Sequence, residues 1–274
     1  MRCAVLGDPI EHSLSPALHR AAYAALGLDW SYDAVRVPSG GLADFVAGLD
    51  DEWRGLSLTM PLKREAMSLL GSRDAWADLA GAANTLLLDG SGVHGLNTDV
   101  PGAIAALREV TTASCERAVV LGGGATATSV LLALAELGCS SAVLAVRHVE
   151  RAAETIEAVG RHAHPPRLET VTLDELGPLG ADVVVSTVPA AAQSAGLLAA
   201  VRDAPVVFDV VYDPWPTPLA ESAADRTLVG GLDLLVHQAV FQVEQMTGRA
   251  PAPVEAMRKA GEHALAARRA AHGR

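Results

Sequence analysis

A lysine, Lys63, directly follows the apolar run "LSLTMPL" at positions 56–62. Such a run is typical of a strand, and α/β proteins place their ligand crevices where strands end. An ammonium group at such a place can stabilise negative charge that builds on a substrate oxygen and can deliver a proton to it. The alternative is a solvated surface lysine, which is the usual state of any single lysine.

Other polar residues stand at the ends of predicted elements. The segment "AANTLLL" puts Asn84 and Thr85 at the start of a strand, and "GLNTDVPG" puts Asn97 and Asp99 just before a helix. Asparagine before a strand is often only a turn residue, and aspartate at a helix start is often only an N-cap. Because several polar side chains and Lys63 all stand at the ends of predicted elements, a polar binding site is favoured.

Two serines precede the first predicted helix, in "GDPIEHSLSPALHRAAYAALG". The spacing predicts Ser15 as the N-cap and Pro16 as the first helical residue. Ser13 is not needed for that cap, and a second hydroxyl would line the same electropositive helix end. The two serines could therefore bind a small carboxylate, although serines are common before helices in any case.

A glycine-rich turn follows the run "RAVVL". Gly122, Gly124 and Ala127 form a G-x-G-x-x-A pattern between a predicted strand and a helix that Gly138 ends. Gly122 permits a tight turn, Gly124 lets the backbone approach a pyrophosphate, and Ala127 lets the helix pack close to the strand. The flanking strand and helix favour a dinucleotide site over a merely flexible loop.

The next predicted strand, "SAVLAV", leads into "RHVER". An NAD site usually offers an acidic residue there for the ribose 2′-hydroxyl, whereas arginine accommodates a 2′-phosphate. Arg147 and Arg151 can each offer forked donors, which favours NADP. The alternative is that both are solvated, which Glu150 makes more plausible for Arg151 than for Arg147.

Short β-rich runs alternate with Ala/Leu-rich helical stretches along the 274 residues, which predicts an α/β protein with mostly parallel sheets. The character of the sequence changes near residue 100, where we expect a domain boundary. The last 40 or so residues predict two helices separated by a Gly/Pro-rich break.

The formal net charge of -11 argues against a nucleic-acid partner and favours a small-molecule ligand. Three distant cysteines predict neither a disulfide nor a metal site. The N-terminal apolar stretch is too short for a signal peptide, and no run is long enough to span a bilayer. A soluble, cytoplasmic protein without a membrane partner is expected.

As a set, these motifs resemble the shikimate dehydrogenase family. The segments "SLSP", "SLTMPLK", "AANT", "NTD", "GGGAT", "VYDPWPTPL" and "GLDLLVHQA" follow the family's order and spacing from end to end. "YDPWPTPL" and the Ala-rich composition are similar in particular to its actinobacterial members.

The resemblance implies a two-domain α/β fold. Residues 1–99 would form a substrate-binding and catalytic domain with a mixed sheet, completed by C-terminal helices in 232–274, and residues 100–231 a Rossmann-type NADP-binding domain. The implied activity is the reversible reduction of 3-dehydroshikimate to shikimate with NADPH, a step toward aromatic amino acids. The family holds both monomers and homodimers.

The resemblance also implies roles for individual residues. Lys63 and Asp99 would form the catalytic pair, with Lys63 as proton donor. The substrate would be held by Ser13 and Ser15 at its carboxylate, by Thr59, and by Lys63, Asn84, Asp99, Tyr212 and Gln238. The predicted cofactor-binding residues are Gly122, Gly123, Gly124, Ala125, Thr126, Ala127, Val146, Arg147, His148, Arg151, Thr187, Val188, Val210 and Gly231.

Some positions depart from the family's pattern. Val146 and His148 replace polar neighbours of Arg147, and "STVPAAAQ", which contains Thr187 and Val188, replaces a common Asn-Ala-Thr strand end. NADP remains the expected cofactor, with a preference that these exchanges could weaken.

Two alternatives stay open. The first is a quinate/shikimate or aminoshikimate dehydrogenase that uses NAD, although Ser15, where a bulkier threonine would favour other substrates, favours shikimate by resemblance. The second is a dinucleotide-binding protein without catalysis. The joint presence of Lys63, Asp99 and Gln238 argues against it.

Overall fold

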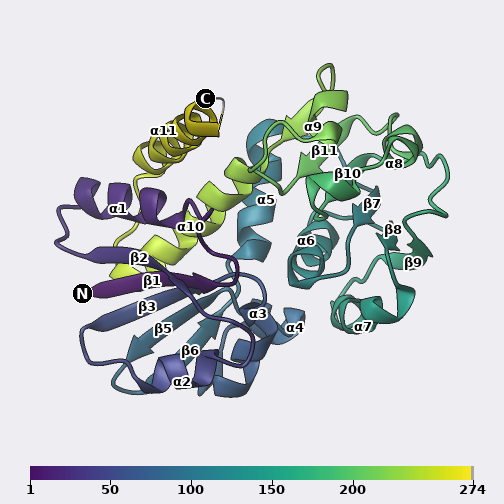
Figure 1. The fold of residues 1–274 in the computed structure, drawn as a ribbon. Helices are drawn as coiled ribbons and strands as arrows, with labels where there is room; N and C mark the ends of the chain where they lie inside the picture. The colour runs from purple at the N-terminus through teal and green to yellow at the C-terminus, as the bar shows by residue number, and fades with distance from the viewer. Residues whose placement is uncertain (273–274) are drawn as a thin grey trace. The chain divides into compact units, whose positions relative to one another are not determined.

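The computed structural model describes residues 1–272 of the chain (Figure 1). Two compact units are present: Met1–Thr98 together with the segment from Leu235 onward, and Asp99–Leu234. The first unit contains a mixed six-stranded sheet, and the described strands of the second form a parallel, Rossmann-like six-stranded sheet. The predicted two-domain α/β fold class is confirmed.

The sheet of the first unit is mixed, with β5 antiparallel to both of its neighbours and the remaining neighbouring strands parallel. Its strands lie in the order β2 (Ser31–Arg36), β1 (Arg2–Gly7), β3 (Trp53–Leu58), β5 (Thr85–Asp89), β6 (Gly92–Leu96) and β4 (Ser72–Arg73). β1 pairs in parallel with both neighbours, whereas β5 is antiparallel to β3 and β6. The carboxyl end of β3 therefore lies beside the amino end of β5.

Helices cover both faces of this sheet. They are α1 (Ser15–Ala25), α2 (Leu42–Ala47), α3 (Leu62–Glu65), the 3₁₀ turn η1 (Ala66–Leu69), α4 (Ala75–Ala80), α10 (Gly231–Thr247) and α11 (Val254–His272). Figure 1 shows α1 and α11 side by side on one side of the sheet and α2 on the other.

Alternation along β3 assigns residues to the two faces. Leu56 and Leu58 join the apolar core on the α2 side. Gly55 faces α10, where a Cβ atom would come within 2.8 Å of the Met246 side chain. The glycine thus allows α10 to pack closely on the strand.

The second unit has strand order β12 (Thr227–Val229), β11 (Val206–Asp209), β10 (Val183–Ser186), β7 (Arg117–Leu121), β8 (Ser141–Val146) and β9 (Arg167–Thr172). Its helices and 3₁₀ turns are α5 (Asp99–Val110), α6 (Ala125–Glu136), η2 (Val149–Ala152), α7 (Ala153–Gly160), η3 (Ala190–Ala192), α8 (Ala195–Ala200) and α9 (Pro218–Ser222). β10 and β11 are buried along their full length, and their apolar runs VVV and VVF are typical of strands covered on both faces.

The helix-end predictions are confirmed in two cases and wrong in one. Gly138, with φ +91°, follows the end of α6, and a Gly/Pro-containing segment separates α10 from α11. Ser15 is not the N-cap of α1 but its first helical residue, because Leu14 takes the N-cap position without a side-chain hydrogen bond. The Ser13 hydroxyl instead accepts a hydrogen bond from the Ser15 N–H at 3.3 Å.

Within residues 1–272, none of the helices combines the length and apolar character needed to cross a membrane.

Candidate active site

Thr59, Lys63 and Asn84 lie together at one edge of the mixed sheet. Thr59 follows β3, Lys63 lies one helical turn later in α3, and Asn84 precedes β5. The Ala83 N–H donates to the Lys63 carbonyl at 2.8 Å, and the Leu58 N–H donates to the Asn84 carbonyl at 2.7 Å. Because β3 and β5 run antiparallel, residues far apart in sequence meet at this edge.

Asn84 and Gln238 are in direct contact. The Asn84 Nδ2 atom donates to Gln238 Oε1 at 3.3 Å and to Thr98 Oγ1 at 2.9 Å. The Asn84 Oδ1 atom accepts from the Thr98 N–H at 2.8 Å. The structure therefore brings together two of the predicted substrate-binding side chains, one before β5 and one on α10.

The two serines lie at the start of α1. Ser15 is 4% exposed, whereas Ser13 is half-buried. The backbone of this loop is held from the C-terminal helix, because Arg268 donates to the carbonyls of His12 and Ser13 at 2.8 and 3.0 Å. Both hydroxyls thus belong to one short segment that α11 fixes.

Asp99 and Tyr212 belong to the second unit. Asp99 is the first residue of α5 and is 5% exposed, and it directly follows Thr98, the residue that Asn84 binds. Tyr212 is half-buried in the loop after β11. This loop is held by Asp209, whose carboxylate accepts from Thr217, Gln193 and the Val211 N–H.

Burial raises the pKa of Asp209, while these hydrogen bonds act in the opposite direction. The three hydrogen bonds thus supply the buried Asp209 carboxylate, at the carboxyl end of β11, with donors.

The glycine-rich turn has the conformation that its sequence predicts. It connects β7 with α6, and Gly122 has φ +104°, which favours glycine. A Cβ atom on Gly122 would overlap the Thr187 hydroxyl and come within 3.3 Å of Val188. Gly122 thus lies against both predicted cofactor-side residues of the β10 end.

Two threonines support the turn from behind. The Thr155 hydroxyl donates to the Gly123 carbonyl at 2.9 Å, and the Thr128 hydroxyl donates to the Gly124 carbonyl at 3.2 Å. The two hydroxyl oxygens lie 2.8 Å apart. Gly124 is the N-cap of α6, so Ala125, Thr126 and Ala127 form its first turn, where backbone N–H groups can bind an anion.

The residues after β8 are exposed. Val146 ends the strand and lies against Gly123, where a Cβ atom would be 3.0 Å from its Cγ1. Arg147, His148 and Arg151 follow, all exposed. His148 Nδ1 lies 3.7 Å from Glu150 Oε1.

The predicted cofactor residues share one edge of the parallel sheet. Most of them follow the carboxyl ends of β7, β8, β10 and β11, whereas Val146 is the last residue of β8 and Gly231 is the first residue of α10. β7 and β10 are neighbours, and the chain builds the sheet outward from this pair in both directions, through β8 and β9 and then through β11 and β12. This is the topological switch point at which doubly wound sheets bind their ligands. Gly231 also lies against Val210, whose carbonyl a Cβ atom on Gly231 would overlap.

Sequence reasoning missed several buried polar residues behind Asn84. The Tyr32 hydroxyl donates to Ser57 at 2.6 Å, Ser57 donates to Gln242 at 2.9 Å, and Gln242 donates to Thr85 at 2.9 Å. Burial raises the pKa of Tyr32, which keeps its hydroxyl a donor. Gln242 stands four residues after Gln238, on the same helix face, and this spacing was the one available signal.

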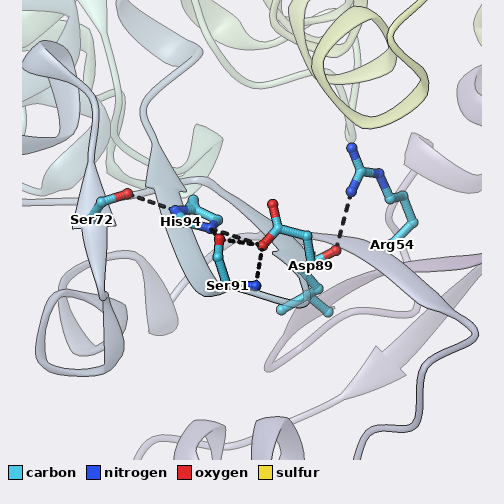
Figure 2. Close-up of polar contacts among 6 residues, drawn as sticks. Arg54, Ser72, Asp89, Ser91 and His94 are labelled. Atoms are coloured by element: carbon cyan, nitrogen blue, oxygen red, sulfur yellow. Dashed lines mark hydrogen bonds and ion pairs between the residues drawn. The ribbon is translucent and has the colours of Figure 1, made fainter.

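A separate polar cluster lies at the β5–β6 hairpin (Figure 2). His94 Nδ1 lies 2.6 Å from Ser72 Oγ, while His94 Nε2 lies 2.9 Å from Ser91 Oγ and 3.1 Å from Asp89 Oδ1. Asp89 also accepts from the Ser91 N–H at 2.8 Å, as in an Asx turn. Hydrogen bonds from Ser91 and His94 lower the pKa of Asp89 to about 2.

These contacts close the tip of the hairpin, which is a structural role. An open hollow of about 560 Å³ beside the cluster is lined by residues such as Trp53, Arg54 and Leu88, and by none of the predicted site residues. Within residues 1–272, no group of three His, Cys, Asp or Glu side chains is placed to hold a metal ion.

Comparison with known proteins finds likeness along nearly the whole chain. Residues 5–86 match the family described as Shikimate dehydrogenase substrate binding domain, and residues 231–260 match Shikimate 5'-dehydrogenase C-terminal domain. The chain is 35% identical to a Shikimate dehydrogenase (NADP(+)) of Moorella thermoacetica over 285 residues, which cover 96% of this chain and 93% of the relative.

Solved structures give the same result. The shikimate dehydrogenase of Mycobacterium tuberculosis is 40% identical, with a TM-score of 0.86 over 96% of this chain and 99% of that one. A Thermus thermophilus shikimate 5-dehydrogenase in complex with NADP(H) and shikimate is 29% identical, with a TM-score of 0.81 over 96% of this chain and 99% of that one.

Proposed function

Because the chain belongs to the shikimate dehydrogenase family, we propose that it catalyses the reversible NADPH-dependent reduction of 3-dehydroshikimate to shikimate, in the pathway toward aromatic amino acids. One observation carries the proposal: the likeness to NADP-dependent shikimate dehydrogenases covers 96% of the chain. The aligned region therefore contains segments from both units, including those that carry the predicted site residues.

The residues present fit NADPH, which would supply the hydride. Gly122 to Gly124 and the first turn of α6 offer backbone N–H groups to the pyrophosphate. The exposed side chains of Arg147 and Arg151 can pair with the 2′-phosphate. Thr187, Val188, Val210 and Gly231, with Val146 and His148, complete the proposed cofactor side.

The proposed chemistry depends on Lys63. As the carbonyl of 3-dehydroshikimate is reduced, negative charge builds on its oxygen, and the Lys63 ammonium stabilises that charge and delivers a proton. Asp99 orients the ammonium and accepts a hydrogen bond from a substrate hydroxyl. General acid–base groups of this kind contribute roughly 100- to 10,000-fold to the rate.

The remaining proposed residues bind and orient the substrate. Ser13 and Ser15 donate to its carboxylate at the start of α1, where the helix dipole favours negative charge. Thr59, Asn84, Gln238 and Tyr212 bind or enclose the hydroxyl-bearing part of the ring. The hydrogen bond between Asn84 and Gln238 supports this assignment, because it places the two side-chain amides next to each other, so that both can contact the same ligand.

The test is the initial rate of cofactor reduction with shikimate and NADP, followed by absorbance of the reduced nicotinamide. The full comparison uses shikimate and quinate, each with NADP and NAD. The proposal expects the highest kcat/KM for shikimate with NADP. A higher value for quinate with NAD would favour the catabolic alternative, and binding of NADP without turnover would favour a non-catalytic protein.

Two finer assignments also belong to the proposal. The 40% identity to the mycobacterial enzyme supports the actinobacterial type of shikimate dehydrogenase. A cytoplasmic location is supported by Cys3, Cys115 and Cys139, the three cysteines of the chain, which are all buried and all thiols in the described structure.

A further inference from the structure

The side-chain amide of Gln242 uses its full hydrogen-bonding capacity inside the first unit. Its Oε1 atom accepts from Ser57 Oγ at 2.9 Å and contacts His19 Nε2 at 3.2 Å. Its Nε2 atom donates to Thr85 Oγ1 at 2.9 Å and to the Asn84 carbonyl at 3.2 Å. Gln242 is 1% exposed, so these four contacts replace water completely.

The partners of Gln242 fix which end of its amide is the oxygen. The Tyr32 hydroxyl donates to Ser57 Oγ at 2.6 Å, so the Ser57 hydrogen is directed to Gln242. The acceptor end of the amide therefore faces Ser57, and the donor end faces Thr85.

This orientation determines the direction of the Thr85 hydroxyl. A hydroxyl has one hydrogen, and Thr85 Oγ1 already accepts from Gln242. Its hydrogen is directed to Asn84 Oδ1, which lies 2.9 Å away. Thr85 is completely buried, so no water competes for this hydrogen.

The Asn84 amide is oriented in turn. Its Oδ1 atom accepts from Thr85 and from the Thr98 N–H, and a flipped amide would direct an N–H group at both donors. Its Nδ2 atom consequently carries both donor hydrogens on the other side, where one is given to Thr98 Oγ1 at 2.9 Å and the second to Gln238 Oε1 at 3.3 Å. The donor end of Asn84 is thereby kept on the side of the proposed substrate-binding residues.

We propose that Thr85 and Gln242 are positioning residues that fix the Asn84 amide, so that the hydrogen it gives to Gln238 Oε1 in this structure is given to a hydroxyl oxygen of the substrate when the substrate binds. The inference rests on the proposed function, since it takes Asn84 as a substrate-binding residue. Neither Thr85 nor Gln242 touches the substrate in this scheme. Their effect is on the affinity for shikimate, and NADP binding is untouched.

Thr85→Val tests the inference, because valine keeps the shape and β propensity of threonine and removes the hydroxyl. We expect the KM for shikimate to rise about tenfold or more, as for the loss of one positioned hydrogen bond in a buried site. We expect kcat and the KM for NADP to stay within about threefold of the wild-type values. Thr85→Ser, which restores the hydroxyl, should return the KM for shikimate toward the wild-type value.

A purely structural role of Thr85 predicts a different result. It would lower the fraction of folded enzyme, so kcat would fall while the KM for shikimate stayed unchanged, and this outcome overturns the inference. Thr247→Val is the matched control, because Thr247 is a partly buried threonine of α10 whose hydroxyl donates to the Val243 carbonyl and accepts from the Arg249 N–H. It should leave both constants unchanged.

Gln242→Glu provides a second variant. A carboxylate accepts from Thr85 and withdraws the hydroxyl hydrogen from Asn84, so the affinity for shikimate should again fall. Gln245→Glu adds the same charge at an exposed position of the same helix and serves as control. Calorimetric titration with shikimate alone measures the affinity without turnover.

Different results would refute the proposed function and the positioning role. A folded wild-type enzyme that reduces no NADP with shikimate refutes the proposed function. A wild-type enzyme that is active, with Thr85→Val and Gln242→Glu variants that bind shikimate equally well, refutes only the positioning role.

Discussion

Lys63 is one of two lysines in the chain, and the other, Lys259, is exposed on α11. The pair offers a matched comparison, since both substitutions to alanine remove one ammonium group. The proposed mechanism requires that only one of them affect the chemical step.

Lys63→Ala should lower kcat for shikimate oxidation by at least about 100-fold, because the group that exchanges the proton with the substrate oxygen is lost. The KM for shikimate should change much less than kcat, since the charge that the ammonium stabilises is greatest in the transition state. Initial rates measure both constants. Near-normal turnover in a folded Lys63→Ala variant would remove Lys63 from this role, and Lys259→Ala should behave as the wild type.

Arg147 and Arg151 are expected to distinguish NADP from NAD. Replacing both by alanine should raise the KM for NADP about tenfold or more, because charge-assisted hydrogen bonds to the 2′-phosphate are lost. The KM for NAD should stay unchanged. Arg167→Ala is the control, since Arg167 is an exposed arginine at the opposite, amino end of the parallel strands. Equal effects on both cofactors would contradict the assignment.

At the scale of elements, the glycine-rich turn contains two glycines with different expected roles, Gly122 in the backbone conformation and Gly124 in cofactor binding. Gly122 has φ +104°, and a Cβ atom there would overlap the Thr187 hydroxyl. Gly124 has φ −87°, with open space around the position of a Cβ atom. The two residues therefore respond differently to the same added methyl group.

Gly122→Ala should lower the free energy of unfolding by about 1 to 3 kcal/mol, as expected for a strained backbone position. Gly124→Ala should change that free energy by less than about 1 kcal/mol, yet raise the KM for NADP, because the methyl group takes space that the pyrophosphate needs. Urea unfolding without cofactor and initial rates measure the two effects. Equal destabilisation by both variants would contradict this division.

Local sequence signals predicted this turn because backbone conformation is a local property. Gly122 and Gly138 both adopt the positive φ values that their positions suggested. The N-cap of α1 was predicted one residue too late, since a serine before a proline matches the N-cap pattern without the capping hydrogen bond being made. Side-chain oxygens near a helix start do not by themselves specify which residue is the cap.

The buried network behind Asn84 could not be predicted in this way. Gln242 contacts Thr85 and Ser57, which precede it by 157 and 185 residues in the chain. A polar residue in a strand or on an apolar helix face gives no local indication of its partner. These contacts form only when α10 packs on β3 and β5. Without knowledge of that packing, the sequence does not tell whether the Gln242 amide is hydrogen-bonded by its neighbours.

At the scale of the molecule, His19 makes the stability of the first unit depend on pH. Burial lowers the pKa of His19 to about 3, while its hydrogen bond with Gln242 acts in the opposite direction. Unfolded histidine has a pKa near 6.5. Between these values the unfolded state binds more protons than the folded state, so stability falls as the pH is lowered.

From pH 7.5 to pH 5, this single group should cost about 2 kcal/mol of the free energy of unfolding. Urea unfolding at several pH values measures the slope, and His19→Gln is the comparison, because glutamine does not titrate. The wild type should lose more stability than the variant over this range. Parallel slopes would show that His19 is protonated in the folded state or contributes nothing.

The first unit is interrupted in sequence by the whole of the second, because residues 99–234 stand between Thr98 and Leu235. The β-strands of the mixed sheet all precede this insertion, whereas α11 and all but the first turn of α10, which cover the sheet, follow the insertion. During translation, residues 99–234 leave the ribosome as a contiguous, self-contained unit, while the earlier strands still lack two of their covering helices. The apolar surface of the mixed sheet is therefore synthesised early but covered by α10 and α11 only at the end of translation. We expect chaperones to bind nascent chains whose synthesis is paused within residues 99–234.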